Sequence, residues 1–460
     1  MEIKNTSYRF ELSETLKLAL PIIVAQIGNV LMGATNSYMI AEIDTSSLAA
    51  GGVANSIYIV FIVLGIGILS TVAPMVATAA GANNKERVGI LFRTSIEVAF
   101  LTTLVLTAGM FIVAENFHYF KQTPEITSIA KVYLEILSLS SFPYLMFIAA
   151  KQFADGLSHT KPSVYITIIG VSVNVLFNWL LIWGNLGFPA WGIVGSGIAT
   201  FIARLVMAGL MFGYIHTNKN ISMYLPDFSQ NFKTSGYIKK IYKIGIPAGM
   251  QLFFEIGAFT ACALIVGQIG TKQAAAHQIA MTFAAISTMI STGISYAGAI
   301  RVAQFLGKEQ FDKIRKAGIA AMLLTCIVMS ICGIFFIIFR TNLAEVFGKN
   351  DQELITIAGS VMLIAGLFQL SDGLQVTSLG ILRGVHDVNI PTVITLISYW
   401  VIGLPIGYVL GITMDLGVDG VWIGLLVGLS ASALMLIVRF FAITKDVNFQ
   451  KLFNNSHAGS

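Results

Sequence analysis

The sequence predicts an all-α integral membrane protein of twelve transmembrane helices, arranged as two lobes of six helices each. Three observations support this fold class: the composition, the alternation of basic residues along the chain, and an internal repeat. Of the 460 residues, 56% are hydrophobic and only 11% are charged, against roughly 25% charged residues in an ordinary soluble domain. A soluble protein of this length would need far more charge to cover its surface. The composition therefore excludes a soluble enzyme and a nucleic-acid-binding protein.

Twelve segments are long enough to span a membrane, since a helix needs about 20 mostly apolar residues to cross the hydrocarbon layer. In the first half they cover residues 15–40, 47–72, 88–114, 128–149, 162–184 and 191–216. In the second half they cover residues 241–267, 273–299, 315–340, 354–381, 391–411 and 418–443. The most polar stretch lies between the halves. We therefore predict an N-terminal lobe over residues 1–216, a cytoplasmic linker over 217–240, a C-terminal lobe over 241–445 and a cytoplasmic tail over 446–460.

The basic residues test these spans independently, because the cytoplasmic loops of membrane proteins are enriched in Lys and Arg. With both termini in the cytoplasm, 22 of the 28 basic residues fall on the cytoplasmic side and five on the opposite side, with Arg204 inside a span. A missed or an additional span would destroy this alternation. The pattern predicts twelve spans with both termini in the cytoplasm.

The two halves of the chain repeat each other with a shift of 226 residues. The shift aligns Lys17–Pro21 (KLALP) with Lys243–Pro247 (KIGIP), and it continues without a gap to Gly81 and Gly307. Each repeat holds an even number of spans, so both enter the membrane in the same orientation. They are then related by a pseudo-two-fold axis along the membrane normal, with a cavity between them. This architecture is typical of transporters.

Two acidic residues, Glu255 and Asp372, lie deep inside predicted spans, each about 16 Å from a helix end at 1.5 Å per residue. A charge at this depth costs at least about 2.5 kcal/mol, which makes both residues functional candidates. Gln251, Gln369 and Gln375 share their helical faces, and we expect no lysine or arginine at matching depth. Carboxylate and amide oxygens suit a hard cation such as Na⁺, while a desolvated carboxylate suits proton carriage. The alternative is that each acid is protonated or bonded to a neighbouring helix for structural reasons.

The first half of the repeat lacks both acids. The 226-residue shift places Asn29 opposite Glu255, and Asp372 falls near Tyr144. The polar positions of the first lobe are instead amides: Asn29, Asn36, Asn55, Asn174 and Asn178. We therefore expect an ion site in the second lobe alone. Asn174 and Asn178 share a helical face and either line the cleft or bond between helices.

Sequence motifs of catalysis are absent. No GxxxxGK[ST] motif is present, so the chain cannot hydrolyse ATP through a P-loop. No paired His/Glu or Ser/His constellation lies at depth, and the three cysteines lack metal-ligand spacing. Glu97 with Arg93, and Glu135 with Lys131, have the four-residue spacing of helix-end ion pairs. We expect no enzymatic activity and no cofactor other than a coupling ion.

Several segments resemble the multidrug and toxic compound extrusion family, most closely its bacterial NorM-like branch, and the resemblance covers essentially the whole chain. The segments include LALPIIVAQIGNVLMGATNSYMIAEI, IGIPAGMQLFFE, AAAHQIA, SYAGAIRVAQFLGK and FQLSDGLQ. The resemblance implies a monomeric antiporter of the bacterial plasma (inner) membrane. In such a protein, Na⁺ or H⁺ enters while an organic, often cationic, drug leaves through a V-shaped cleft between the lobes.

The resemblance also assigns roles to individual residues. Glu255 and Asp372 match acids that bind the coupling cation, which is Na⁺ if the coupling is to sodium. The residues predicted to contact substrate or line the cleft are Gln278, Asn36, Asn174 and Asn178. Many relatives carry an aspartate where this chain has Asn36, a departure that favours the second-lobe acids as ion carriers.

A flippase of lipid-linked sugars, from a related superfamily branch, is the alternative function. A flippase would need cationic side chains in its cavity to hold a pyrophosphate. Arg204 and Arg301 are the only deep candidates for that role, and both are explicable by a position near the inner face.

Overall fold

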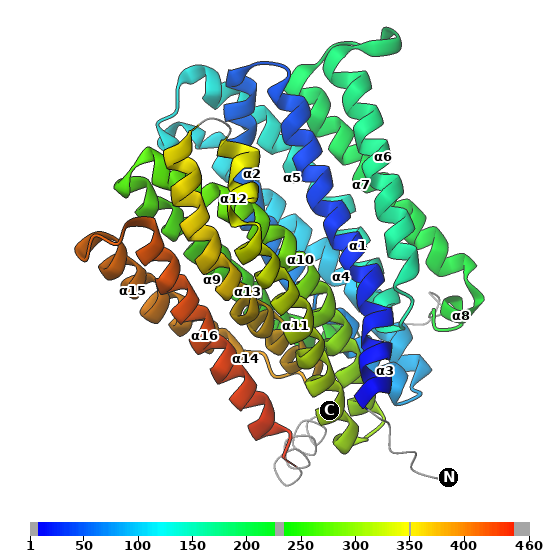
Figure 1. Ribbon diagram of the computed structural model, residues 1–460. Helices are drawn as coiled ribbons and strands as arrows, with labels where there is room; N and C mark the ends of the chain where they lie inside the picture. The colour runs from blue at the N-terminus through cyan, green and yellow to red at the C-terminus, as the bar shows by residue number, and fades with distance from the viewer. Residues whose placement is uncertain (1–7, 226–233, 349–350, 446–460) are drawn as a thin grey trace. The chain divides into compact units, whose positions relative to one another are not determined.

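The computed structural model describes residues 8–225, 234–348 and 351–445, and all regular elements within these ranges are helices (Figure 1). Seven α-helices make up most of the first half. They are α1 (Tyr8–Ala41), α2 (Thr45–Leu69), α3 (Val72–Gly81), α4 (Lys85–Glu115), α5 (Pro124–Gly156), α6 (Lys161–Trp183) and α7 (Gly192–Thr217). One short 3₁₀ turn lies between α4 and α5, and another lies between α6 and α7. A single turn, α8 (Lys219–Ser222), follows α7.

The second half contains a matching series of long helices. Those before the last two spans are α9 (Ser235–Ile269), α10 (Thr271–Gly307), α11 (Phe311–Ile338), α12 (Arg340–Gly348) and α13 (Gln352–Gly384). The eleventh span is built from α14 (Asn389–Leu396), the π-helical turns η3 (Ile397–Gly403) and η4 (Val409–Thr413), and α15 (Leu404–Tyr408) between them. The last helix is α16 (Gly417–Ile443).

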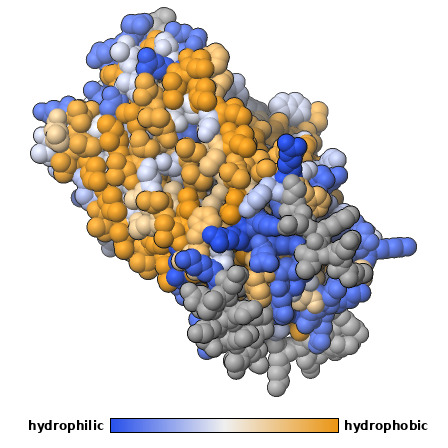
Figure 2. Space-filling model, turned by 60° about the horizontal axis from the view of Figure 1, so that its bottom comes forward, coloured by the Kyte–Doolittle hydropathy of each residue, from blue (hydrophilic) through white to orange (hydrophobic). Residues whose placement is uncertain are grey.

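Twelve helices of the described residues are long and apolar enough to cross a membrane, which confirms the predicted number of spans. The second span differs from the prediction, because α2 and α3 continue it from Thr45 to Gly81. Figure 2 shows a broad band of hydrophobic side chains on the face in view, bordered by hydrophilic side chains. Leu104, Val105 and Ile331 are each at least 60% exposed. A lipid-facing surface explains this exposure, so the chain is a multi-pass membrane protein.

The chain divides into two compact units. We call Val24–Gly249 the first lobe, and Met1–Ile23 together with Met250–Ser460 the second lobe. The division thus falls inside α1 and α9, whereas the sequence predicted it in the linker over 217–240. Residues 226–233 of that linker, and the predicted tail over 446–460, lie outside the described residues. The two division points are 226 residues apart, the shift of the sequence repeat.

Equivalent close contacts explain why the division falls inside these helices. In the first lobe, a Cβ added to Gly67 of α2 would lie 2.3 Å from the Cα of Gly249 in α9. In the second lobe, a Cβ added to Gly293 of α10 would lie 2.3 Å from a side-chain carbon of Ile23 in α1. Gly293 lies 226 residues after Gly67, and Gly249 lies 226 residues after Ile23. The beginnings of α1 and α9 therefore pack into equivalent places in opposite lobes.

A buried ion pair also fixes the beginning of α1 in the second lobe. The carboxylate of Glu11, which is fully buried, accepts a hydrogen bond from Arg301 of α10. Two ion pairs expected from helical spacing are confirmed in the first lobe, Arg93 with Glu97 at 3.1 Å and Lys131 with Glu135 at 4.0 Å.

Candidate ion and substrate sites

The two deep acids belong to the second lobe, on α9 and α13. Asp372 is 1% exposed, and one of its carboxylate oxygens accepts a hydrogen bond from Thr288 of α10 at 2.9 Å. Glu255 is partly buried and makes neither a hydrogen bond nor an ion pair with another described residue. The two carboxylates are close enough to interact electrostatically. The structure thus brings together the two residues predicted to bind the coupling cation.

The amide side chains near these acids already have partners. Gln369 accepts a hydrogen bond from Ser287 at 2.6 Å, and Gln375 accepts one from Tyr399 at 3.4 Å. The Nε2 atoms of both glutamines are buried and lack acceptors in the described part of the chain. An unpaired buried donor costs about 1–3 kcal/mol. A cation bound by these amides would be held by their side-chain oxygens, which now accept the hydrogen bonds from Ser287 and Tyr399.

Arg383 is a charged neighbour of the acids that the sequence did not predict. Its side chain is 8% exposed, and it lies within electrostatic range of Glu255. Its guanidinium donates a hydrogen bond to the amide oxygen of Gln251 at 3.3 Å. Gln251 in turn donates to the carbonyl of Val388 at 3.2 Å and to Thr392 at 3.0 Å. The sequence predicted no lysine or arginine at matching depth to pair with the acids. Arg383 forms an ion pair with neither acid, but from the last turn of α13 its long side chain comes within electrostatic range of Glu255.

The arrangement is suited to a hard monovalent cation or a proton. The described residues contain no group of three or more His, Cys, Asp or Glu side chains that could hold a metal ion. Two carboxylates and a hydroxyl provide only oxygen atoms, which suit alkali cations rather than zinc or copper. One nearby arginine offsets part of the negative charge and so weakens the attraction for a cation.

Three asparagines of the first lobe, Asn36, Asn174 and Asn178, form one network around Thr200 of α7. Asn36 of α1 and Asn174 of α6 both donate to the Thr200 hydroxyl, at 3.0 and 3.3 Å. Asn178 donates to the side-chain oxygen of Asn36 at 2.9 Å. Asn174 and Asn178 are fully buried, so these two residues bond between helices, which is one of the two possibilities left open by the sequence.

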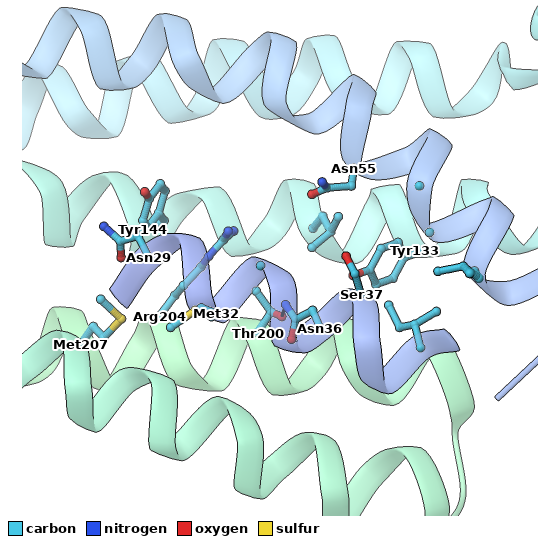
Figure 3. Close-up of a pocket in the computed structure, with 16 residues that line it drawn as sticks. Asn29, Met32, Asn36, Ser37, Asn55, Tyr133, Tyr144, Thr200, Arg204 and Met207 are labelled. Carbon is cyan, nitrogen blue, oxygen red and sulfur yellow. Dashed lines mark hydrogen bonds between the residues drawn. The ribbon is translucent and has the colours of Figure 1, made fainter. Parts of the chain in front are cut away.

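Asn36 also lines a cavity of 140 Å³ inside the first lobe. Figure 3 shows this cavity between side chains of α1, α2, α5 and α7. Its lining includes Asn29 and Asn55, which the sequence identified as polar positions of this lobe, and Arg204 from α7. Asn174 and Asn178 do not line the cavity.

Gln278, the remaining residue predicted to contact substrate, belongs to the second lobe. Its side chain is exposed on α10 and makes no hydrogen bond with a described residue. The adjacent His277 is 3% exposed and accepts a hydrogen bond from Trp422 of α16 at 3.1 Å. His277 therefore has a structural role in holding α10 against α16.

Comparisons with known proteins agree with this architecture. The family model MatE matches residues 21–180 and 247–409, two blocks whose starts are separated by the repeat shift. The chain is 32% identical to a multidrug resistance protein NorM of Aliivibrio fischeri, over 95% of this chain and 96% of the relative. It is 31% identical to a multidrug resistance protein MdtK of Yersinia pseudotuberculosis, over 95% of this chain and 97% of the relative.

A crystal structure of a eukaryotic MATE transporter has the same fold, with a TM-score of 0.86, 19% identity, and coverage of 96% of this chain and 98% of that one. The family model covers well over half of the sequence, and the curated relatives span nearly all of it. The chain therefore belongs to the MatE family of membrane transporters and is not an enzyme.

Proposed function

We propose that this protein exports organic, often cationic, drugs and toxic compounds in exchange for an inward-moving cation. Sodium is the favoured coupling ion, and a proton is the other candidate. The proposal places the protein in a bacterial plasma membrane as a monomer, with both termini in the cytoplasm. The names of the curated relatives, which are multidrug resistance proteins, support drug-like substrates.

The observation that carries this proposal is the pair of deep acids in one lobe. Glu255 has no ion-pair partner among the described residues, and Asp372 accepts one hydrogen bond from these residues, donated by the neutral hydroxyl of Thr288. Carboxylates in a membrane protein are costly to keep without a partner, and they mark ion pathways and proton relays. A cation arriving at this site would supply the missing charge, since Arg383 contacts Gln251 and not a carboxylate.

Coupling requires that the ion and the drug disfavour each other's binding. In the proposed cycle, the outward-open protein releases drug when the ion engages Glu255 and Asp372. The lobes then reorient, the ion leaves on the cytoplasmic side, and the freed acids allow the next drug molecule to bind. By linkage, the ion lowers drug affinity by the same factor as the drug lowers ion affinity.

The experiment that tests this proposal measures efflux from proteoliposomes. Rhodamine B methyl ester, a cationic dye, is loaded, and either a Na⁺ gradient or a pH gradient is imposed separately. Wild type is compared with Glu255→Gln, Asp372→Asn and the control Glu115→Gln, which removes an exposed carboxylate of the first lobe paired with Lys131. We expect one gradient to drive efflux in wild type and in the control, and neither gradient to do so in the two acid variants.

Two other outcomes would contradict different parts of the proposal. If the acid variants keep gradient-driven efflux, the ion site lies elsewhere. If neither gradient moves dye in wild type, coupled drug export is wrong, and transbilayer movement of lipid-linked sugars is the function to assay next.

A further inference from the structure

The cavity of the first lobe contains one charged side chain, and that charge is positive. Among its 16 lining residues, Arg204 is charged, and no aspartate or glutamate is present. The other polar side chains are uncharged and include the amides of Asn29, Asn36 and Asn55. Figure 3 shows Arg204 reaching from α7 into this group of side chains. The cavity therefore offers a positive group surrounded by neutral hydrogen-bonding partners.

Arg204 lies near the middle of the 26-residue helix α7, about 18 Å from its beginning at 1.5 Å per residue. An ionised group at this depth in a membrane protein is a functional candidate by default. The guanidinium is held in place by one nitrogen, Nη1, which donates to the hydroxyls of Tyr58 and Ser140, each at 2.6 Å. Its carbon also lies 4.6 Å from the ring centre of Tyr144. These contacts orient the guanidinium without neutralising it.

The remaining nitrogens of Arg204 are unused. Nε is fully buried and has no hydrogen-bond partner. Nη2 also has no hydrogen-bond partner, but it is not fully buried. Throughout the described residues no carboxylate lies within 4.0 Å of this guanidinium. The acids in neighbouring first-lobe spans have basic partners of their own: Glu97 pairs with Arg93, Glu135 with Lys131, and Asp155 with Lys151.

Arg301, the other arginine that the sequence identified as deep, shows the contrast. Its guanidinium pairs with the fully buried carboxylate of Glu11 in the second lobe. A buried arginine with a purely structural role is expected to have such a partner. Arg204 has neutral hydroxyls and an aromatic ring instead, so its charge is left for something outside the chain.

The repeat reinforces this contrast. Aligning Gly192 and Gly195 of α7 with Gly417 and Gly420 of α16 places Arg204 opposite Leu429. The residues on either side of Leu429 are a glycine and a serine. Shifting the alignment by one residue in either direction therefore still places an uncharged residue opposite Arg204. Asn29, in turn, is the first-lobe equivalent of Glu255. The equivalent regions of the two lobes thus carry opposite charges.

We propose that the first-lobe cavity binds the carboxylate of a transported compound, with Arg204 as its ligand. A guanidinium offers two parallel N–H donors to a carboxylate. Drug-sized compounds occupy sites of about 300–1,000 Å³, so a cavity of 140 Å³ takes the acidic end of a compound and leaves the rest outside. The substrates are then aromatic amphiphiles with one carboxylate, including zwitterions that also carry an amine. This inference rests on the proposed drug transport and narrows its substrate class.

The test compares binding of rhodamine B, which has a free carboxylate, with that of rhodamine B methyl ester, which lacks it. Fluorescence polarisation on purified protein, without any ion gradient, gives the ratio of the two dissociation constants. The variants are Arg204→Gln, Arg204→Lys and the control Arg315→Gln, which removes an exposed arginine stacked on Phe441 in the second lobe.

In wild type and in Arg315→Gln we expect the acid to bind more tightly than the ester. In Arg204→Gln that preference should fall about tenfold, the usual effect of losing one hydrogen bond to a charged group. Arg204→Lys keeps the charge without the forked geometry, and we expect an intermediate preference. Because a ratio is measured, a variant that binds both dyes less well remains informative.

An unchanged ratio in a folded Arg204→Gln variant overturns the carboxylate site and leaves drug transport intact. A wild type that binds the ester as tightly as the acid overturns it as well. If wild type binds neither dye, the proposed function fails, and the inference fails with it. If Arg204→Gln does not fold, the ratio of the two dissociation constants in Arg204→Lys decides instead, and an unchanged ratio there overturns the carboxylate site.

Discussion

Glu255 in the second lobe and Asn29 in the first occupy equivalent positions of the repeat, yet their surroundings differ in charge. Glu255 and Asp372 bring two carboxylates close together in the second lobe. The first-lobe cavity that Asn29 lines has Arg204 as its charged group. The close contacts at Gly67 and Gly293 are nevertheless equivalent in the two lobes. Packing positions have thus been kept while the polar positions have diverged, as expected if the lobes share a scaffold but divide ion coupling and substrate recognition between them.

The largest effect is expected on the final dye gradient, which tests whether Glu255 acts in ion coupling and Arg204 in substrate recognition. If one ion is exchanged for one dye molecule, a tenfold ion gradient sustains at most about a tenfold dye gradient, since each factor of ten is worth 1.4 kcal/mol. Glu255→Gln should abolish that final dye gradient. Arg204→Gln should change how fast the final gradient is reached but not its size, because stoichiometry and not affinity sets the end point. Long-time dye distributions in proteoliposomes provide the measurement, and a lowered end point in Arg204→Gln would assign Arg204 to coupling.

The next effect concerns the equivalent glycines. Gly67→Ala should destabilise the protein by about 3 kcal/mol, because the new methyl group meets the backbone of Gly249, which can move only with its helix. Gly293→Ala should cost less, about 2 kcal/mol, because the atom it meets at 2.3 Å is the side-chain carbon Cγ1 of Ile23, while the backbone nitrogen of Ile23 lies farther away, at 3.0 Å. Thermal unfolding of detergent-purified protein measures both. Gly209→Ala, with no neighbour within 4 Å, is the matched control and should change stability by no more than about 1 kcal/mol.

Equal losses at the two positions would mean that the contacts at Gly67 and Gly293 are energetically as well as geometrically equivalent. A larger loss at Gly293 would contradict the difference between backbone and side-chain contacts.

The amide network of the first lobe has no counterpart at the equivalent position of the second. Thr200→Val should cost about 2 kcal/mol, because it leaves the side-chain donors of Asn36 and Asn174 without their shared acceptor. Leu425 stands at the corresponding position of α16 and is an apolar core residue. The measurement is again thermal unfolding, with Thr260→Val as the control. Thr260 is exposed and bonds within its own helix, so a loss there as large as at Thr200 would show that the network contributes nothing.

The sequence predicted those features that depend on local pattern. Span number follows from runs of apolar residues, and the pairs Arg93–Glu97 and Lys131–Glu135 follow from helical spacing. The lobe boundary was not predicted in this way: the polar stretch suggested residues 217–240, whereas the structure divides the lobes inside α1 and α9.

What the sequence could not predict depends on how each helix is rotated against its neighbours. Arg383 reaches the acids from the end of α13, and Arg204 turns into a cavity and not towards a carboxylate. Asn174 and Asn178 share a face that the structure buries completely. Helical spacing shows which residues share a face, but it does not say which neighbouring helix or cavity that face meets.

The smallest effect is expected at the beginnings of α2 and α10, which the repeat aligns. Asp44 caps α2 by accepting hydrogen bonds from the backbone and the hydroxyl of Ser47, at 2.6 and 2.9 Å. Its counterpart, Gly270, gives α10 no side-chain cap. Asp44→Ala should therefore cost about 0.5–1 kcal/mol, at the low end of capping effects because the side chain is exposed. Gly270→Asp should gain a few tenths of a kcal/mol.

The pH dependence separates a cap from a general loss of packing. The hydrogen bonds from Ser47 hold the pKa of Asp44 below its usual value of 3.8. Its carboxylate therefore stabilises the fold fully above the unfolded-state pKa of about 3.9, and that contribution is lost as the pH falls through the lower, folded-state pKa. Unfolding midpoints of wild type and Asp44→Ala should differ at neutral pH and converge as the solution is acidified. A difference that persists in acid would mean that Asp44 acts through packing, and the contrast between the two helix beginnings would then not be one of capping.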